Sequence, residues 1–391
     1  MWRLTTKAGP EANRKVQKAV DAAIAEGGEI GLQVAAYLNG ELAVDVWGGL
    51  ADETTARRVD GDTLFPVFSV TKAVTATALH IQAERGLIDY DKPIAHYWPE
   101  FAAQGKDKAT VRDALTHRAG IPLMPEGVSP EQMCDFDWMV DRLAKMKPVF
   151  VPGTTSAYHS YTFGWIIAEC VRRTDPKRRP FGSFVQEEIC APLGIDNLWI
   201  GIPPAVEPRV AKLTNMLAPP PGTPAPGPLR LGAIPAQVGV IQEVFGRSDV
   251  RRACIPGAGG IMNARSEARF FAMLANGGEL NGVRLLSSER IRSFSTLRSN
   301  PDEIDQVLAR VVNLGIGGFH LGGESPPAPP VIGRNPHIIS HPGAGGSIGW
   351  ADPDARLAVG ICHNRMFDAP TPEGNPLQPI GDAVRRALGV D

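Results

Sequence analysis

The chain has 391 residues, of which 43% are hydrophobic, and this is typical of a globular protein with a sizeable core rather than of a disordered or fibrous chain. Its 40 Lys and Arg residues nearly balance its 42 Asp and Glu residues, which gives a formal net charge of −2. Because no dense basic run stands out beyond a short stretch at residues 172–179, we expect neither nucleic acid nor an anionic membrane as a partner.

The N-terminal residues and the cysteines point to a cellular compartment. Residues 1–20 lack the apolar segment and the small-residue cleavage site of a signal peptide, and no apolar run reaches the roughly 18 residues that a membrane span needs. We therefore expect a cytoplasmic protein. The five cysteines are odd in number and widely separated, without a C-x-x-C pair, so the sequence predicts neither a disulfide framework nor a metal site. We expect no cofactor, and the sequence leaves a homo-oligomer open.

The chain begins with the pattern of a helix and a β-hairpin. Residues 10–26 place apolar side chains at helical spacing behind a first-turn proline, and a Gly-Gly pair ends the pattern. Residues 32–49 form two β-rich runs around Asn39-Gly40, the dipeptide that best suits a two-residue type I′ turn. This turn is the strongest local prediction in the sequence.

The middle of the chain has mainly helical patterns. Helices are predicted at residues 72–86, 110–120 and 266–278. Two proline-rich stretches, residues 218–228 and 322–330, are unsuited to helices or central strands. We expect them to form surface loops of the kind that often border a site.

The C-terminal part, like the N-terminal part, has the patterns of one β-hairpin and one helix. Residues 346–364 predict a hairpin that turns at Asp352-Pro353-Asp354, and residues 375–390 predict a closing helix. Strands at both ends imply one antiparallel sheet built from both chain ends and covered by the two terminal helices.

These elements predict a division into two parts with a site between them. Residues 1–95 and 255–391 are expected to form an α/β domain of the α+β type, and residues 96–254 a mainly helical inserted domain. The junction of two such parts is a common location for a ligand pocket.

The stretch Gly345–Gly349 matches G-x-S-x-G, a pattern that marks the nucleophile of many serine esterases. That serine must sit at a sharp turn from a strand into a helix, yet Ser347 is followed by a proline turn and another strand. His341 lies six residues away, roughly 20 Å along an extended strand, and so cannot pair with Ser347 within this strand. We predict that Ser347 is a small residue in a glycine-rich strand that another segment approaches closely.

A better nucleophile lies at the start of an almost entirely apolar helix. Ser69 and Lys72 form S-x-x-K, a spacing that places both side chains on one helix face. Burial among apolar neighbours would lower the pKa of Lys72, and the helix N-terminus would stabilise negative charge on the serine oxygen. The alternative, a solvated helix lysine, fits poorly because the helix has almost no polar face before His80.

Together with this motif, further blocks resemble the serine hydrolases of the class C β-lactamase type, and within them the family VIII carboxylesterases. The blocks follow in the order of that family across residues 15–390: DTLFPVFSVTK, ERGLIDYDKPIAHYWPEF, ATVRDALTHRAGIP, VPGTTSAYHSYTFGWI, GAGGIMNARSEARFFAMLANGG and HPGAGGSIGW. The resemblance implies a β-lactamase/transpeptidase-like fold with a five-stranded antiparallel sheet.

The resemblance also implies the roles of four residues in the middle of the site. Ser69 corresponds to the acylated serine, Lys72 to its partner, and Tyr158 to the tyrosine of the family's Y-x-N element. The third position of that element is Ser160 here. A serine hydroxyl can bond the Lys72 ammonium, but it lacks the carboxamide that reaches a substrate amide in the family. Without the resemblance, Tyr158 would equally suit a core or loop tyrosine that bonds to the backbone.

A third element of the family, K-T-G, corresponds to His341-Pro342-Gly343. The backbone N–H of Ala344 would then complete an oxyanion hole with that of Ser69. Because a histidine is a weaker cation than the usual lysine, we expect His341 to hold a substrate carboxylate poorly and neutral esters to react faster than β-lactams. The alternative for His341 is a strand-end histidine without a role in binding.

Two flanking cations, Lys72 and a protonated His341, would favour the Tyr158 phenolate, so either Lys72 or Tyr158 is a candidate base. His117 is expected to be structural, at a helix C-terminus before a Gly120 cap.

These residues predict a serine carboxylesterase that works through a Ser69 acyl-enzyme, with a small-molecule ester as its partner. A β-lactamase or D-alanyl-D-alanine peptidase shares the nucleophile, but it acts on substrates outside the cytoplasm. An acyltransferase would use the same site with water excluded. A catalytically silent ligand-binding member of the family is disfavoured because Ser69 and Lys72 are both present.

Overall fold

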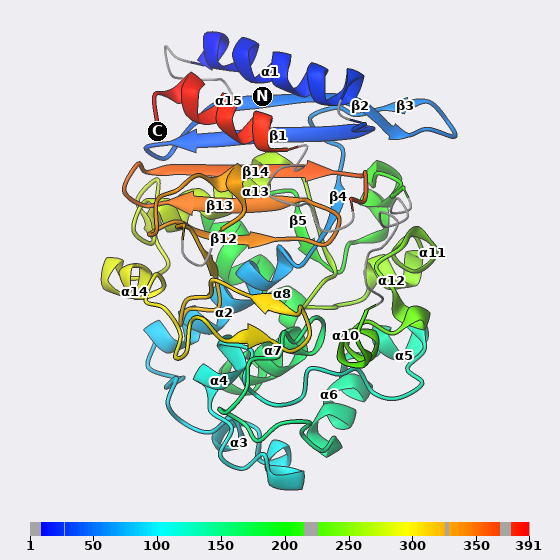
Figure 1. Cartoon of the computed structure of the whole chain (residues 1–391), viewed down its shortest axis with the longest axis vertical. Helices are drawn as coiled ribbons and strands as arrows, with labels where there is room; N and C mark the ends of the chain where they lie inside the picture. Colours follow the sequence, from blue (N-terminus) through cyan, green and yellow to red (C-terminus); the bar gives the residue numbers. More distant parts are fainter. Residues whose placement is uncertain (1–8, 27, 215–225, 325–327, 368–376, 391) are drawn as a thin grey trace.

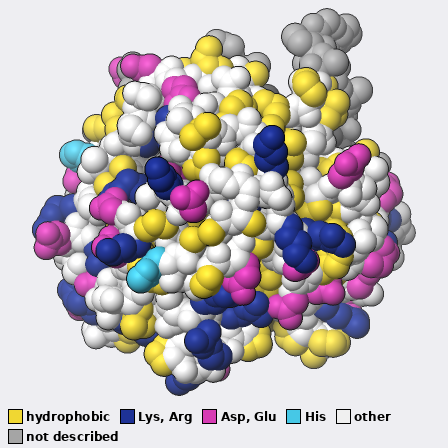
Figure 2. Space-filling model, turned by 90° about the horizontal axis from the view of Figure 1, so that it is seen from below, with side chains coloured by type: hydrophobic (Ala, Val, Ile, Leu, Met, Phe, Trp, Pro, Cys, Tyr) yellow, Lys and Arg dark blue, Asp and Glu magenta, His cyan; other side chains and the backbone are white. Residues whose placement is uncertain are grey.

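The structure is a computed structural model and describes residues 9–26, 28–214, 226–324, 328–367 and 377–390. Most of the first proline-rich stretch and the centre of the second therefore lie outside the described residues. Figure 1 shows the two terminal helices together above a sheet, with most of the other helices below it. Figure 2 shows one face of the molecule, where acidic and basic side chains are interspersed. None of the helices in the described ranges combines the length and the apolar composition needed to cross a bilayer.

Both predicted hairpins are present, and they pair with each other. Strands β1 (Gly31–Leu38) and β2 (Glu41–Asp52) are joined by Asn39 and Gly40, at φ 53° and 83°, as the predicted type I′ turn requires. Strands β13 (Ile348–Asp352) and β14 (Leu357–His363) form the second hairpin. Because β1 pairs antiparallel with β14, the two chain ends share one sheet, and this prediction is confirmed.

The sheet has seven strands, in the order β11-β12-β13-β14-β1-β2-β3, and not the five expected from the resemblance. The five central strands are the two hairpins and β12 (Ile339–Pro342). The extra strands are the two edges, β3 (Arg57–Arg58) and β11 (His320–Leu321). A strand of two residues is too short to show the alternation by which a sequence predicts a strand, so neither edge could be predicted.

The terminal helices α1 (Gly9–Ala25) and α15 (Gln378–Leu388) contact each other and cover one face of this sheet (Figure 1). Helix α13 (Ala264–Ala275) covers the other face. Both faces of the sheet are therefore buried, and strand β14 is apolar on both sides. Val359 and Ile361 belong to the core under the terminal helices, while Ala358 and Cys362 belong to the core under α13.

A small second sheet, in the order β4-β6-β5, lies beside the main one and leads into the site. Its strands are β4 (Phe65–Phe68), β5 (Leu198–Ile200) and β6 (Gly260–Met262). Short hairpins are formed by β7 (Glu279–Leu280) with β8 (Val283–Arg284) and by β9 (Ile304–Asp305) with β10 (Arg310–Val311).

The middle of the chain is mainly helical, as predicted. Its α-helices are α2 (Thr71–Glu84), α3 (Ile94–Tyr97), α4 (Val111–Leu115), α5 (Pro130–Cys134), α6 (Phe136–Lys145), α7 (Thr162–Thr174), α8 (Phe181–Val185), α9 (Ala191–Leu193), α10 (Pro228–Ala233), α11 (Gln242–Phe245), α12 (Ser248–Arg252) and α14 (Ser288–Ser293). Short 3-10 or π segments are Pro99–Gly105, Gln186–Cys190, Pro204–Arg209, Ala236–Val238 and Pro330–Ile332. The division into a sheet domain and an inserted domain stays a prediction.

One helix ends earlier than its pattern indicates. The predicted helix at residues 110–120 is α4, which stops at Leu115, and His117 already has a left-handed φ of 59°. His117 is therefore not a helix C-terminal residue before a Gly120 cap. Its Nδ1 instead accepts the backbone N–H of His159, and this buried contact holds the turn in place.

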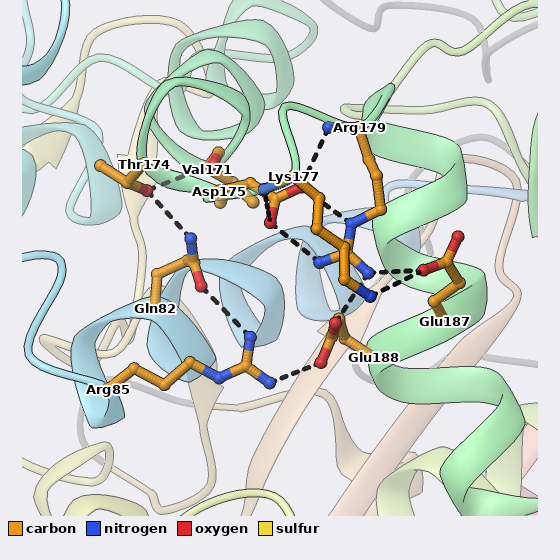
Figure 3. A network of polar contacts seen from close by, with 9 residues as sticks. All are labelled: Gln82, Arg85, Val171, Thr174, Asp175, Lys177, Arg179, Glu187 and Glu188. Atoms are coloured by element: carbon orange, nitrogen blue, oxygen red, sulfur yellow. Dashed lines mark hydrogen bonds and ion pairs between the residues drawn. The ribbon is translucent and has the colours of Figure 1, made fainter.

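Helix α2 is fixed at its far end by the polar network in Figure 3. Gln82 donates to Thr174 at the end of α7, and Arg85 pairs with Glu188. The centre of the network is the pair of Arg179 with Asp175, whose side chains are 10% and 1% exposed. Since α2 carries Lys72 near its other end, this network fixes the helix on which the site is built.

Asp175→Asn is expected to lower the free energy of unfolding by about 2 kcal/mol at neutral pH, because it removes the main partner of the Arg179 charge and leaves only Glu187 and Glu188 to pair with it. The hydrogen bonds from Arg179 hold the pKa of Asp175 at about 2, below its usual 3.8. The stabilisation is therefore complete above the unfolded pKa and is lost as the pH falls from about 4 towards 2. Denaturant unfolding at several pH values should show the two proteins converging in acid. The matched control Asp137→Asn removes an exposed partner of Arg172 and should cost about 0.5 kcal/mol or less.

Candidate active site

Ser69 lies at a sharp turn between a strand and a helix. Strand β4 ends at Phe68, whose φ of 48° is unusual for a residue other than glycine, and α2 begins at Thr71. The Phe68 ring packs edge-on against Phe245, with ring centroids 5.0 Å apart, and this packing supports the strained residue. The turn places Ser69 in the wall of a cavity of about 210 Å³.

Lys72 is fully buried directly behind Ser69. Its Nζ lies 2.9 Å from Ser69 Oγ, and it donates to the backbone carbonyls of Ser160 at 2.6 Å and of Gly257 at 2.8 Å. Burial lowers the pKa of Lys72 well below its usual 10.5, which favours the neutral amine. A neutral amine has two N–H groups, which the two carbonyls accept, and one lone pair, which is then free to accept the Ser69 hydroxyl proton.

Tyr158 also lines the cavity. Its ring centroid is 5.1 Å from Lys72 Nζ and 4.4 Å from the centroid of the His117 ring. Burial raises the pKa of Tyr158 above 10, and the opposing effect of the Ser69 hydroxyl is smaller. The phenolate expected from the sequence is therefore not favoured, because burial disfavours the charged form of Tyr158 more than the nearby charge of Arg310 favours it.

A buried carboxylate, Asp305, holds the segment that carries Tyr158. Its Oδ1 accepts the backbone N–H groups of Tyr158, Val307 and Leu308, each at 3.0 Å, and its Oδ2 accepts the Ser156 hydroxyl at 2.8 Å. Asp305 is 1% exposed and belongs to β9. Asp305 could not be predicted from the sequence, because it lies far from Tyr158 in the chain and in no recognisable motif.

Ser160 contacts Lys72 through its backbone and not through its side chain. Its carbonyl accepts from Lys72 Nζ, whereas its buried Oγ has no hydrogen-bond partner among the described residues. The expectation that the Ser160 hydroxyl bonds the lysine is therefore wrong. The side chain lines the cavity and is positioned to contact a ligand.

His341 is buried beneath the cavity and is not one of its lining residues. Burial lowers its pKa well below 6.5, so the ring is neutral rather than the cation considered from the sequence. The histidine in the cavity wall is His320, on the edge strand β11, whose ring lies 4.8 Å from that of His341. His320 could not be predicted as a site residue from the sequence, because the two-residue strand that places it has no sequence pattern of its own.

The segment after His341 brings Gly343 and Ala344 to the cavity. A Cβ atom on Gly343 would lie 2.2 Å from the carbonyl oxygen of Val67, so only glycine allows this close approach to the strand that leads to Ser69. The backbone N–H groups of Ser69 and Ala344 have no acceptor among the described residues. Both are thus available to a ligand oxygen, as an oxyanion hole requires.

Ser347 lies outside the cavity. It is 2% exposed, and its Oγ accepts the backbone N–H of His363 at 3.2 Å. At the neighbouring Gly346 there is no space for a side chain, because a Cβ atom there would lie 2.8 Å from Nε2 of the His363 ring. The geometry agrees with the prediction of a small residue where another segment approaches closely.

The cavity as a whole is mostly apolar with a few polar groups. Its lining residues are Phe68, Ser69, Tyr158, Ser160, Tyr161, Arg230, Ile234, Val240, Ala258, Leu308, Arg310, His320, Pro342, Gly343, Ala344, Gly345, Gly346 and Phe367. No group of three or more His, Cys, Asp or Glu side chains within the described ranges could hold a metal ion. The arrangement brings a serine, a buried amine, a phenol and two free amides to one place, which suits acyl transfer through the serine.

Comparison with known proteins agrees with this geometry. The family model named Beta-lactamase matches residues 16–379. The chain is 37% identical over 382 residues to "Esterase/beta-lactamase LipL" of Mycobacterium tuberculosis (strain ATCC 25618 / H37Rv), covering 92% of this chain and 85% of that protein.

Two solved structures have the same fold over nearly the whole chain. One is a family VIII carboxylesterase, with a TM-score of 0.86 and 33% identity, covering 96% of this chain and 98% of the other. The second is a penicillin-binding protein homolog from Caulobacter crescentus, with a TM-score of 0.85 and 33% identity, covering 97% and 99%. The β-lactamase/transpeptidase-like fold and the resemblance stated from the sequence are confirmed, and the chain belongs to the Beta-lactamase family.

Proposed function

We propose that the protein hydrolyses carboxylic esters through an acyl-enzyme formed on Ser69. The observation that carries the proposal is the contact of the Ser69 hydroxyl with a buried amine whose other two contacts are backbone carbonyls. The names of similar proteins support the ester as substrate class, since both an esterase/β-lactamase and a family VIII carboxylesterase share more than 30% identity with this chain.

In the first half of the reaction, Lys72 accepts the Ser69 proton while Ser69 Oγ attacks the ester carbonyl carbon. The negative charge that develops on the carbonyl oxygen is stabilised by the N–H groups of Ser69 and Ala344. When the carbon–oxygen bond to the alcohol breaks, the Tyr158 phenol donates a proton to the departing oxygen. The Lys72 ammonium then gives its proton to the Tyr158 oxygen, which restores both side chains.

In the second half, water takes the place of the alcohol. Lys72 accepts a proton from the water while the water oxygen attacks the acyl carbon. The bond between that carbon and Ser69 Oγ then breaks, Lys72 returns the proton to Ser69 Oγ, and the carboxylic acid is released. Lys72 is the better base of the two candidates, because burial favours its neutral form and also favours the protonated form of Tyr158.

β-Lactam hydrolysis is the second candidate, favoured by the names of the relatives but disfavoured by Ser160, which lacks the carboxamide of the family. Acyl transfer to an alcohol would differ only in the acceptor. A silent binding protein is disfavoured because Ser69 and Lys72 are not only present but in contact. A cytoplasmic location, and a small-molecule ester as the partner, stay predictions.

The test is a panel of p-nitrophenyl esters and one chromogenic cephalosporin, assayed with the wild type and Ser69→Ala. We expect ester hydrolysis by the wild type to exceed cephalosporin hydrolysis, and both to disappear in the variant. Ester hydrolysis that survives in Ser69→Ala would show that another group is the nucleophile. Cephalosporin turnover matching the esters would identify a β-lactamase.

Ser347→Ala is expected to retain most of the wild-type ester hydrolysis, because its hydroxyl faces His363 and not the cavity. The loss of one buried hydrogen bond should lower the free energy of unfolding by about 1 kcal/mol. Steady-state kinetics and denaturant unfolding measure the two effects separately. A loss of activity comparable to that of Ser69→Ala, in a folded variant, would contradict the assignment.

A further inference from the structure

The cavity at Ser69 contains two arginines and no acidic side chain. Arg230 enters from α10 and Arg310 from β10, whereas no Asp or Glu is among the lining residues. Neither arginine forms an ion pair with a described residue, although most arginines elsewhere in these ranges do. The protein as a whole carries a formal charge of −2, so the excess of positive charge is local to the cavity.

The charge of Arg310 reaches the reacting groups. Burial lowers the pKa of His320 to about 3, and the charge of Arg310 adds to that shift. Burial raises the pKa of Tyr158, and the same charge opposes that increase. Arg310 is therefore close enough to act on an anion bound beside Tyr158.

The backbone of Arg310 is also held at a fixed place relative to the nucleophile. In the β9–β10 hairpin it is the direct pairing partner of Asp305, which accepts the backbone N–H of Tyr158. Leu308, from the same hairpin, lines the cavity. A guanidinium on an anchored hairpin loses less freedom on binding than one on a loose loop, and its two parallel N–H donors match a carboxylate.

The wall around the two arginines suits a ligand with an apolar part and a charged end. Most of the remaining wall is apolar or aromatic, formed by side chains such as Ile234, Val240 and Phe367. Arg230 is half-buried and Arg310 is exposed, so both guanidinium groups lie where the cavity opens to solvent, and a charge pair formed there is weakened by added salt. The apolar wall would contact the carbon chain of a ligand while the arginines contact its charged end.

We propose that Arg230 and Arg310 bind a carboxylate carried by the ester, so that the substrates of this protein are anionic esters. The inference rests on the proposed ester hydrolysis and names its substrate class. It departs from the expectation, based on His341, that the site holds a substrate carboxylate poorly, because His341 is not in the cavity wall and the two arginines are. The carboxylate can lie on the acyl side, as in a half-ester of a dicarboxylic acid, or on the alcohol side.

Two matched pairs of esters distinguish these sources. For the acyl side, mono-p-nitrophenyl adipate is compared with p-nitrophenyl hexanoate, which has the same chain without the charge. For the alcohol side, meta-acetoxybenzoate is compared with meta-acetoxybenzamide. We expect the anionic member of at least one pair to have a kcat/KM at least about tenfold above its neutral match at low ionic strength. The ratio should fall towards one as salt is added.

Variants of the two arginines test whether they cause the higher kcat/KM of the anionic esters. In the Arg230→Gln, Arg310→Gln double variant the ratio is expected to fall to about one or below, and Arg310→Lys should retain part of it because the charge remains without the paired donors. Arg58→Gln, which removes an exposed arginine of β3 outside the cavity, is the matched control and should leave the ratio unchanged.

Neutral esters that react faster in both pairs, or a ratio that is the same in the double variant, would overturn the inference. If those neutral esters are still cleaved in a Ser69-dependent manner, the proposed function stands without it. If no ester of either pair is cleaved in a Ser69-dependent manner, the proposed function fails, and the inference fails with it.

Discussion

Lys72→Ala is expected to lower kcat for any ester substrate by about three orders of magnitude or more, and Ser69→Ala by at least as much. The two residues form one proton-transfer unit, with Lys72 Nζ 2.9 Å from Ser69 Oγ, so the double variant should be little worse than either single variant. The measurement is steady-state kinetics of the three variants on one ester. Losses that multiply in the double variant would show that Lys72 acts independently of Ser69.

The pH profile of the wild type supplies a second test of the same base. Lys72 accepts a proton only when it is neutral, so kcat/KM should rise as the pH increases through its pKa and then level off. Because burial lowers that pKa well below 10.5, the plateau should be reached at a lower pH than an ordinary lysine would allow. Activity that continues to rise up to pH 10 would instead indicate a base with the usual pKa of an exposed lysine or of a phenol.

Asp305→Ala is expected to lower kcat by about a hundredfold with a smaller change in KM, because it releases the backbone that places Tyr158. The variant removes four hydrogen bonds, including those to Tyr158 and Ser156. Asp305 touches no reacting atom, so it is a positioning residue and not a catalytic one. Steady-state kinetics give the split between kcat and KM, and denaturant unfolding identifies a variant that is simply unfolded.

Asp305→Asn is the conservative counterpart. An amide oxygen can still accept the three backbone N–H groups, so this variant should recover much of the activity that Asp305→Ala loses. If both variants hydrolyse esters at the wild-type rate while folded, the position of Tyr158 does not depend on Asp305 or does not matter to the reaction. A lower kcat in a folded variant would show that Asp305 positions Tyr158 for the reaction. A purely structural role would lower the free energy of unfolding without changing kcat.

The parts of the fold that were predicted correctly depend on short-range chemistry. Asn39-Gly40 specifies its own turn because both residues adopt a positive φ at little cost. The S-x-x-K spacing specifies that Ser69 and Lys72 share a helix face, whatever surrounds them. The burial of Lys72 also followed from the sequence, because the apolar residues around it leave no polar face to carry it to solvent.

The parts that were missed depend on contacts between distant segments. Asp305 meets Tyr158 across 147 positions of the chain, and nothing in the local sequence of either residue indicates the other. Arg230 and Arg310 likewise come from separate segments and became notable only when the structure placed both in one cavity. The expectation that His341 is protonated was wrong, because the ring is fully buried and its pKa is lowered well below 6.5. The sequence does not show whether a histidine at the end of a strand is exposed or buried.

The role of Ser69 as the nucleophile is tested most directly by the site of covalent labelling by an organophosphonate that mimics the acylation step. After incubation with the probe, intact-protein and peptide mass spectrometry locate the adduct. We predict one adduct, on the peptide that contains Ser69, formed with loss of ester hydrolysis and much more slowly in Lys72→Ala. An adduct on Ser347, or full loss of activity without modification of Ser69, would show that Ser69 is not the nucleophile.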